Sequence, residues 1–320
     1  MVLAGLVYRQ AAVGTFVSSA ARCLRLAFII IGFDEIWWRR RAVSFSSLVG
    51  GIGKIAWENG AQFTVMHLRS DADLQTFIRS VVDERSFDGL LLRPKITLSA
   101  QRIEVLEQHS LPYVILRAHL LDRAANCVIP ADEEDVHRAT RHLVDLGHRR
   151  IAYVSGPREW PVFADRLRGY RRALEEEGIE WNEDLIREAD THQSGDPSAK
   201  ETVIDLLRST PRPTAILAGT SPLVPWVYRA VEELSLHIPK DVSVVGSDEE
   251  LVGGDLVPTL TRFGPNHYDI GMQATRALIQ MIEGGVGSPR ETVLPPSFRL
   301  GASTTRAAED GEGASPRDRA

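Results

Sequence analysis

Cysteine is nearly absent from this chain of 320 residues, which contains only Cys23 and Cys127. Two cysteines cannot form a disulfide framework, and neither belongs to the closely spaced pair that a zinc or redox motif requires. We therefore expect both to be small buried apolar residues in the reducing environment of the cytoplasm. The sequence predicts no bound metal and no cofactor.

Long hydrophobic runs are also missing. No stretch of about 18 apolar residues is present, so the sequence predicts no membrane-spanning helix. Residues 11–21 are small and fairly apolar, but Thr15, Ser18 and Ser19 interrupt them and no basic region precedes them, which argues against an export signal. We predict a cytoplasmic protein that has no membrane partner.

The chain has no excess of basic residues, because its formal net charge is −6. Proteins bind nucleic acids mainly by neutralising phosphates, so the overall charge provides no attraction to DNA. Any contact with DNA would have to be local. With 43% hydrophobic and 25% charged residues, the composition is that of a globular protein with one large or two medium domains.

Catalytic motifs are missing as well. The sequence has no Gly-x-Ser-x-Gly, His-Glu-x-x-His or Cys-x-x-Cys motif. The segment GGIGK at residues 50–54 resembles a phosphate loop only weakly, because Ile55 replaces the required Ser or Thr and the glycines lie in a helical pattern. His148 lies between a helix and a strand, where a structural role is favoured. Residues 132–135 are all acidic and could bind a cation, but a helix N-terminus attracts acidic residues without any metal. We predict that the protein is not an enzyme.

A regular alternation of apolar strands and amphipathic helices is present. Residues 24–31 are almost all apolar, as in a parallel strand buried on both faces. Further strands are predicted at 63–66, 88–92, 113–116, 151–154, 214–218, 242–245 and 291–298, and helices at 45–60, 71–84, 99–109, 136–146, 163–178, 197–208, 222–234 and 268–283. Such an alternation predicts an α/β protein with doubly wound parallel sheets, whose ligands bind outside the carboxyl ends of the strands.

Four motifs occur in a fixed order: LGHRRI at 146–151, SGP at 155–157, RLRGY at 166–170 and IPKDVSVVG at 238–246. In order and spacing they resemble the effector-binding region of the LacI/GalR family of bacterial transcription regulators. The resemblance covers roughly residues 24–304. It implies two Rossmann-like, doubly wound subdomains with the periplasmic-binding-protein-like fold of type I.

The resemblance also implies a division of the chain. The N-terminal subdomain would comprise residues 24–149 and 267–288, and the C-terminal subdomain residues 150–266 and 289–304. Residues 1–23 are interpreted as a degenerate linker and hinge remnant or a disordered segment, and residues 305–320 as a disordered tail. In the family a helix-turn-helix headpiece comes first. No headpiece is visible in this sequence, so it is expected to be missing or truncated.

Two residues are the main candidates for binding an effector in the cleft that the resemblance implies between the subdomains. Arg166 lies three residues before Gly169, at the position whose arginine in this family holds effector hydroxyls or a carboxylate. A guanidinium suits this task because its planar donors can bind two oxygens at once. Asp248 matches the first aspartate of the family's Gly-Tyr-Asp-Asp motif, and a carboxylate can accept two hydroxyls. The alternative is that these two side chains pair only with each other or with backbone groups.

Weaker candidates lie near the start of the chain. Ser44 and Phe45 fall on the family positions that open the first helix and line the cleft, although Phe45 could equally be part of the core. Trp37 stands in a longer loop than usual, next to Trp38 and the arginines at 39–41. It could stack on a ligand or cover a dimer surface or a strand edge.

Four positions depart from the family pattern, among them Thr220, which replaces an aspartate. Gly219 stands where a ligand-binding asparagine is usual, Ser247 replaces an aromatic residue, and Asp190 falls near a position that is often aromatic. We include Gly219 and Asp190 among the candidate effector-binding residues. Because a site that leaves polar groups unpaired discriminates against a ligand, the departures mean that the effector cannot be named by analogy.

The sequence thus predicts the core of a LacI-type transcriptional regulator, expected to be a repressor, that binds a sugar or related metabolite and forms a homodimer. An operator DNA would be a partner only if a headpiece is present or is supplied by another chain. Two alternatives remain: a sugar-binding protein of the same fold without DNA binding, and a modulator without a headpiece that acts on a paralogous repressor.

Overall fold

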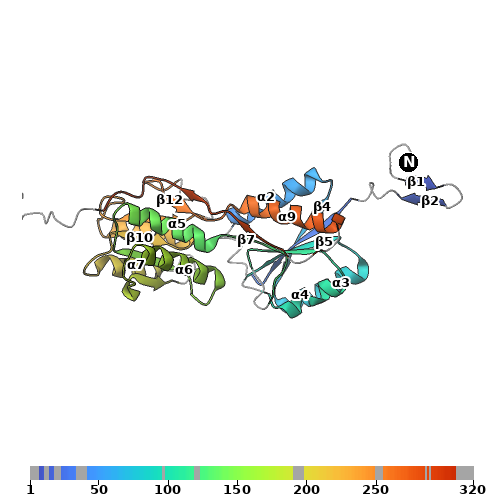
Figure 1. The fold of residues 1–320 in the computed structure, drawn as a ribbon, viewed down its shortest axis with the longest axis horizontal. Helices are drawn as coiled ribbons and strands as arrows, with labels where there is room; N and C mark the ends of the chain where they lie inside the picture. The colour runs from blue at the N-terminus through green and yellow to red at the C-terminus, as the bar shows by residue number, and fades with distance from the viewer. Residues whose placement is uncertain are drawn as a thin grey trace, which may run out of the picture. The chain divides into compact units, whose positions relative to one another are not determined.

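The computed structural model describes residues 7–10, 14–17, 23–33, 42–95, 98–118, 123–189, 198–248, 255–284, 287 and 290–307. These residues form two compact units. Unit 1 contains the described residues of Met1–Trp38, Phe45–Ile129 and His267–Val293, and unit 2 those of Arg39–Ser44, Pro130–Asn266 and Leu294–Ala320. Each unit has a six-stranded sheet of its own, with helices on both faces (Figure 1).

Unit 1 has the strand order β13-β7-β6-β5-β3-β4. Its strands are β3 (Arg25–Ile31), β4 (Gln62–Leu68), β5 (Gly89–Pro94), β6 (Tyr113–Leu116), β7 (Cys127–Pro130) and β13 (Glu291–Leu294), and its helices are α2 (Ala42–Glu58), α3 (Asp71–Glu84), α4 (Ala100–Gln108) and α9 (His267–Gly284). The pairs from β4 through β3, β5 and β6 to β7 are parallel. Helices α2 and α9 lie on one face and α3 and α4 on the other (Figure 1). All residues of β3 except Arg25 are buried, as expected for a strand covered on both faces.

The glycines of the segment 50–54 serve helix packing. A Cβ atom on Gly51 would lie 2.0 Å from the carbonyl oxygen of Tyr268, and one on Gly271 would lie 2.3 Å from that of Leu48. Helices α2 and α9 therefore meet backbone against backbone, which only glycine permits. The segment is helical, in agreement with the helical pattern of its sequence, which was the reason for rejecting a phosphate loop.

Unit 2 has the strand order β14-β12-β11-β10-β8-β9. Its strands are β8 (Ile151–Ser155), β9 (Ile186–Glu188), β10 (Ala215–Ala218), β11 (Ser243–Ser247), β12 (Thr261–Phe263) and β14 (Phe298–Arg299), and its helices are α5 (Asp132–Asp145), α6 (Pro161–Glu176), α7 (Ser198–Arg208) and α8 (Val224–Glu233). The pairs from β9 to β12 are parallel, and β14 joins β12 antiparallel. One core lies between the sheet and the pair α5 and α6, and a second lies on the face of α7 and α8.

The border between the units differs from the predicted one. Residues 130–149 belong to unit 2, whereas the predicted division assigned them to the N-terminal subdomain. The reason is the packing of α5 along α6. A Cβ atom on Gly169 of α6 would lie 2.0 Å from the carbonyl oxygen of Glu133, so the two helices are in direct backbone contact.

The two ends of the chain also differ from the predicted picture. Within residues 1–23, the backbone of β1 (Val7–Gln10) pairs antiparallel with β2 (Gly14–Val17), which differs from the disordered segment that was one of the two interpretations. The other interpretation, a linker and hinge remnant, stays a prediction. In the expected tail, Thr305 N donates to Ser243 Oγ at 3.0 Å and Ala307 N to the Leu146 carbonyl at 2.9 Å. Residues 305–307 are thus attached to unit 2, and residues 308–320 lie outside the described part of the chain.

Most other predicted elements occur close to their predicted positions. The single strand predicted at 291–298 is divided into β13 in unit 1 and β14 in unit 2. Pro295 and Pro296 lie between them, and proline has no amide hydrogen to donate to a sheet. None of the described helices is long and apolar enough to cross a membrane.

Candidate functional site

Three residues form a row at the carboxyl ends of the strands in unit 2. Val154, Ala218 and Gly246 are register partners on β8, β10 and β11, so the next residues, Ser155, Gly219 and Ser247, lie side by side. Gly219 N donates to the Val154 carbonyl at 2.7 Å, which continues the ladder beyond β10. Ligands of open parallel sheets bind at this edge.

Arg166 of α6 lies beside this row and is 1% exposed. Its Nε donates to Asp132 Oδ1 at 2.7 Å, Nη2 lies 2.6 Å from the same oxygen, and Nη1 donates to the Gly219 carbonyl at 2.7 Å. The guanidinium carbon also lies 5.9 Å from the centre of the Phe263 ring. A buried arginine requires such compensation of its charge. The side chain is therefore held by α5, by the loop after β10 and by β12.

Asp248, which follows β11, is held by a different partner. It is 6% exposed, its carboxylate accepts a hydrogen bond from Arg262 Nη1, and its backbone N donates to the Phe263 carbonyl at 2.9 Å. Arg166 and Asp248 thus do not pair with each other. Each forms an ion pair within unit 2, and both lie at the same edge of the sheet.

Three buried hydroxyls accompany these charges. Tyr153 Oη and Ser155 Oγ lie close enough to interact but do not form a well-aligned hydrogen bond, and Ser247 Oγ has no partner among the described residues. Burial raises the pKa of Tyr153 to about 12, so its hydroxyl remains protonated and can donate. An unsatisfied buried polar group costs about 1–3 kcal/mol, so these hydroxyls are suited to taking up a water molecule or a ligand group.

Gly219 has no room for a side chain. A Cβ atom there would lie 2.4 Å from Ser155 Oγ and 2.8 Å from Tyr153 Oη. Gly219 contributes its carbonyl to Arg166 instead of a side chain to a ligand. The hydroxyls of Tyr153 and Ser155 occupy the space that the Cβ atom of an asparagine at position 219 would need.

The remaining candidates are not all brought to this place. Ser44 is buried at the start of α2, and the half-buried ring of Phe45 stacks on Phe28 of β3, with 6.2 Å between ring centres. That contact favours the interpretation of Phe45 as part of the packing of unit 1. Trp37 and Asp190 lie outside the described residues.

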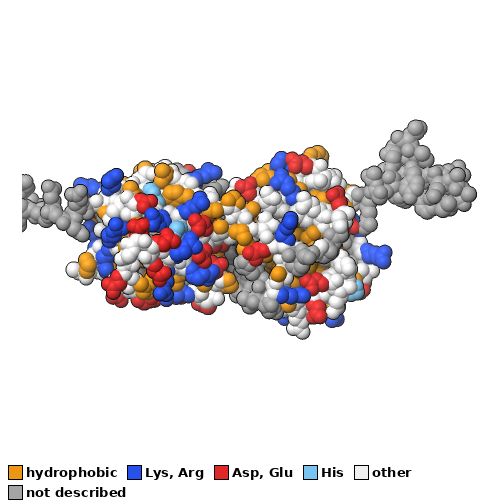
Figure 2. Space-filling model, viewed as in Figure 1, with side chains coloured by type: hydrophobic (Ala, Val, Ile, Leu, Met, Phe, Trp, Pro, Cys, Tyr) orange, Lys and Arg blue, Asp and Glu red, His pale blue; other side chains and the backbone are white. Residues whose placement is uncertain are grey.

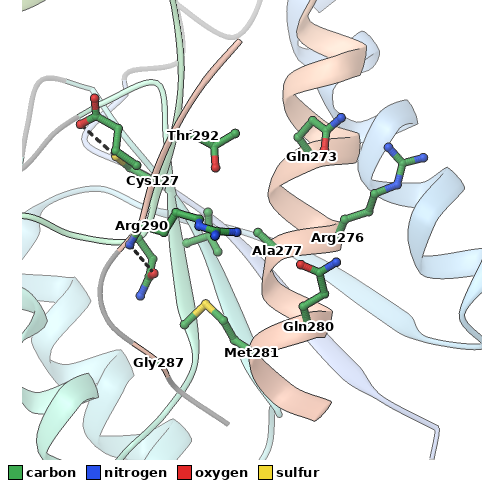
Figure 3. A pocket seen from close by; sticks show the side chains of 12 residues that line it. Cys127, Gln273, Arg276, Ala277, Gln280, Met281, Gly287, Arg290 and Thr292 are labelled. Carbon is green, nitrogen blue, oxygen red and sulfur yellow. Dashed lines mark hydrogen bonds between the residues drawn. The ribbon is translucent and has the colours of Figure 1, made fainter. Parts of the chain in front are cut away.

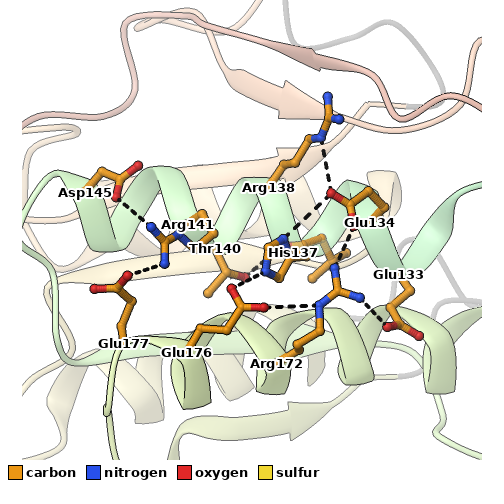
Figure 4. A network of polar contacts seen from close by, with 11 residues as sticks. Glu133, Glu134, His137, Arg138, Thr140, Arg141, Asp145, Arg172, Glu176 and Glu177 are labelled. Carbon is orange, nitrogen blue, oxygen red and sulfur yellow. Dashed lines mark hydrogen bonds and ion pairs between the residues drawn. The ribbon is translucent and has the colours of Figure 1, made fainter.

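The four acidic residues that open α5 all have protein partners. These are Arg166 for Asp132, Arg168 and Arg172 for Glu133, Arg138 and Arg172 for Glu134, and the backbone N of Ser297 for Asp135. Figure 4 shows the part of this network that joins α5 to α6, and charged side chains of both signs alternate over these helices in Figure 2. Exposed pairs of this kind stabilise little individually. The described residues contain no group of three or more His, Cys, Asp or Glu side chains arranged to hold a metal ion.

His148 lies at the opposite edge of the sheet and has a structural role. Its Nε2 lies 3.0 Å from the Thr305 carbonyl and 3.0 Å from Ser243 Oγ, and its Nδ1 lies 2.9 Å from Thr214 Oγ1. A carbonyl can only accept, so Nε2 carries the hydrogen and Nδ1 accepts one from Thr214. Burial lowers the pKa of His148, which favours this neutral form.

Comparison with known proteins places the fold and the site in context. The family model of the periplasmic binding protein-like domain matches residues 140–304, just over half of the chain. Catabolite control protein A of Priestia megaterium is 28% identical over 264 residues, which are 82% of this chain and 78% of its own. The transcriptional regulator CelR of Thermobifida fusca is 29% identical over 258 residues, 78% of this chain and 73% of its own. The chain belongs to the periplasmic-binding-protein-like family, among its LacI/GalR regulators.

Solved structures agree with this assignment at the level of the fold. A complex of the regulator CelR with cellobiose has a TM-score of 0.75 and 24% identity, over 88% of this chain and 85% of that one. A LacI-family regulator from Enterococcus faecium with bound ribose has a TM-score of 0.72 and 23% identity, over 88% of this chain and all of that one. The predicted α/β fold of the LacI/GalR core is confirmed. CelR and the Enterococcus faecium protein are transcription regulators, in agreement with the prediction that this chain is not an enzyme.

Sequence reasoning missed several residues of the site. It interpreted Asp132 only as part of an acidic helix start, and it gave no role to Tyr153 and Ser155. The position of Ser155 at the end of a predicted strand, in the motif SGP, was a usable signal. No local signal links Asp132 to Arg166, because 34 residues separate them.

Proposed function

We propose that this chain is the effector-sensing core of a cytoplasmic LacI-type transcription regulator, expected to be a repressor, and that a small polar metabolite binds at the carboxyl edge of the sheet in unit 2. The observation that carries the proposal is the buried Arg166 beside the row of Ser155, Gly219 and Ser247. Fixed charge and unsatisfied hydroxyls converge there at the edge where parallel sheets bind ligands.

The charges of the site favour a neutral ligand rich in hydroxyls. Arg166 is balanced by Asp132, and Asp248 is balanced by Arg262. These two ion pairs have no net positive charge that would attract an anion. Sugar hydroxyls can both donate hydrogen bonds to these groups and accept hydrogen bonds from them. A carboxylate can accept hydrogen bonds from more than one donor, which suits Asp248 to the binding of hydroxyl groups. Relatives of similar fold have been solved with cellobiose and with ribose, which supports a sugar or related metabolite.

The expected mechanism follows from linkage. A ligand with different affinities for two conformations of the core shifts the population toward the one that it prefers. If one conformation also binds operator DNA more tightly, through a headpiece and in a homodimer, the ligand changes DNA occupancy by the same coupling free energy. Such couplings amount to about 1–3 kcal/mol, or about 5–150-fold in affinity.

The proposal is tested by screening the full chain against neutral sugars, sugar acids and nucleobases by thermal shift, with titration calorimetry of every positive. The oligomeric state is measured by analytical ultracentrifugation with and without ligand. The purified chain is then used to select DNA fragments from the source genome, and the fragments selected with and without ligand are compared. We expect a dimer that binds a neutral sugar-like compound. Saturable ligand binding without any selected DNA would favour the alternative of a sugar-binding protein or a modulator of another repressor.

A further inference from the structure

A concave surface in unit 1 is formed by residues that take no part in the site proposed above. It is an open groove of about 860 Å³ beside α9, within the range of about 300–1,000 Å³ that is usual for ligand sites. Figure 3 shows its two sides. The helix α9 supplies Gln273, Arg276, Ala277, Gln280 and Met281, and the strand side supplies Val114, Asn126, Cys127, Arg290, Glu291 and Thr292.

The groove exists because α9 covers only part of the sheet. Helix α9 buries Ile270, Ala274 and Leu278 and packs against β5 and β6. β7 and β13 continue the sheet beyond β6. The space over these last strands is bounded by Val114 and by Ala277 of α9. The groove therefore has an apolar floor and is built from regular elements of the sheet and the helix.

Two arginines without a protein partner among the described residues border this groove. Arg290 extends into it, whereas the Arg276 side chain projects from α9 away from the strand side (Figure 3). Neither the Arg276 nor the Arg290 side chain makes a hydrogen bond or an ion pair with any residue that the structure describes, and both residues are exposed. The backbone of Arg290 is fixed, however. Its N donates to Asn126 Oδ1 at 3.1 Å, and its carbonyl accepts from Cys127 N at 3.1 Å. In Figure 3 its side chain extends from the strand side toward α9.

The one acidic residue of the groove is turned away from Arg290. Side chains alternate along a strand, so Thr292 and Arg290 share one face and Glu291 lies on the other. There the Glu291 carboxylate accepts a hydrogen bond from Cys127 Sγ at 3.8 Å, and Cys127 belongs to the core under α3 and α4. Burial raises the pKa of the Cys127 thiol to about 12, so the thiol remains a donor to Glu291. The groove therefore contains the Arg290 guanidinium without an acidic partner, and Arg276 stands at its edge on α9.

We propose that this groove is a small-molecule site, which binds an organic anion through a phosphate or carboxylate held by Arg290, toward which the exposed Arg276 side chain turns from α9 when the anion binds. A guanidinium matches either oxyanion with two parallel hydrogen bonds. The amides of Gln273 and Gln280 have no partner among the described residues and can bind polar groups of the same molecule, while Met281 and Ala277 contact its apolar parts. No residue of this site belongs to the proposed effector site in unit 2, so the two proposals stand independently.

The groove is built from elements that adjoin the borders between the units. Unit 1 ends within β7, after Ile129, and within β13, after Val293, and the chain re-enters unit 1 at His267, the first residue of α9. Arg276 lies within α9 and Arg290 directly before β13, so the anion bridges two elements that adjoin these borders. If it prefers one conformation of the core, it changes effector affinity, and the effector changes its affinity by the same factor.

The test is titration calorimetry of the full chain with inorganic phosphate, pyrophosphate and citrate at constant ionic strength, with glycerol as the neutral comparison. The variant R276Q/R290Q is compared with R79Q/R102Q. The latter removes the same charge from the other face of unit 1, where neither side chain has a partner among the described residues. We expect at least one oxyanion to bind, R276Q/R290Q to lose about tenfold or more in affinity, and R79Q/R102Q to bind like the wild type.

A second variant tests the shape of the groove without changing charge. Ala277→Leu fills the space beside Arg290 and is expected to weaken the same oxyanion, with an unchanged circular dichroism spectrum as evidence of folding. The proposal is overturned if none of the three oxyanions binds, or if the two double variants lose affinity equally, since the effect would then be general electrostatics. Unchanged affinity in Ala277→Leu would also contradict it.

Discussion

Arg166 and Asp132 form a buried ion pair in unit 2, with 2.6 Å between Nη2 and Oδ1. The pair ties α6 to the first turn of α5, and a second guanidinium nitrogen ties both to the loop after β10. The pair therefore fixes three elements around the proposed effector site. Removing one partner of a buried pair leaves an uncompensated charge, which costs more than removing both.

Asp132→Ala is expected to destabilise the protein by about 3–5 kcal/mol, because it leaves the guanidinium of Arg166 buried without its carboxylate. Urea denaturation measures the difference. The matched comparison is Asp132→Leu/Arg166→Met, which removes both charges and should cost clearly less than Asp132→Ala alone. A double variant that is less stable than the single one would show that the pair itself provides the stability.

Gly219→Ala is expected to cost about 1–3 kcal/mol, because the new methyl group would overlap Ser155 Oγ and Tyr153 Oη. The added change Ser155→Gly removes the closer obstacle and should recover part of the loss. Gly284→Ala is the control, since a Cβ atom there meets nothing within 4 Å. Equal stability of Gly219→Ala and Gly284→Ala, measured in the same urea titration, would refute the close packing described for Gly219.

Acidification is expected to destabilise unit 2 through His148. Burial lowers its pKa in the folded protein, partly opposed by the Thr305 carbonyl, while the unfolded chain retains a value of about 6.5. Above that pH neither state binds the proton. Below it the unfolded state binds the proton more readily, so the free energy of unfolding falls as the pH is lowered through about 6.5.

The measurement is urea denaturation at a series of pH values between 5 and 8 for the wild type and His148→Asn. The variant should be less stable at neutral pH but should lose less stability on acidification. Some dependence will remain, because burial also lowers the pKa of His142. Identical slopes for both proteins would contradict a neutral, buried role for His148.

The fold was predictable from the sequence because its elements have local signals. The apolar run of β3 and the glycines that follow α2 and α6 mark strands and helix ends without any tertiary information. The break between β13 and β14 was also encoded, by Pro295 and Pro296, although the single predicted strand ignored it. The border at Pro130 was not encoded locally, because it depends on the contact of Gly169 with α5.

The site was predictable only in part. Resemblance pointed to Arg166 and Asp248, which lie at the carboxyl edge of the sheet in unit 2, but their partners Asp132 and Arg262 follow from tertiary packing. The constraint on Gly219 depends on the register of β8 and β10, which no local pattern specifies. The groove beside α9 was missed because its arginines lie 14 residues apart on a helix and at the start of a strand, where single charges are ordinary surface residues.

The most direct test of the account concerns Asp248. The neutral ligand found by the screen is titrated into the wild type, Asp248→Ala, Asp248→Asn and the surface control Asp205→Ala, with sedimentation velocity on each to follow the oligomeric state. The account predicts that both Asp248 variants lose at least about tenfold in affinity while their oligomeric state and the binding by Asp205→Ala stay unchanged. Wild-type affinity in Asp248→Ala would contradict the assignment of the effector site to the carboxyl edge of unit 2.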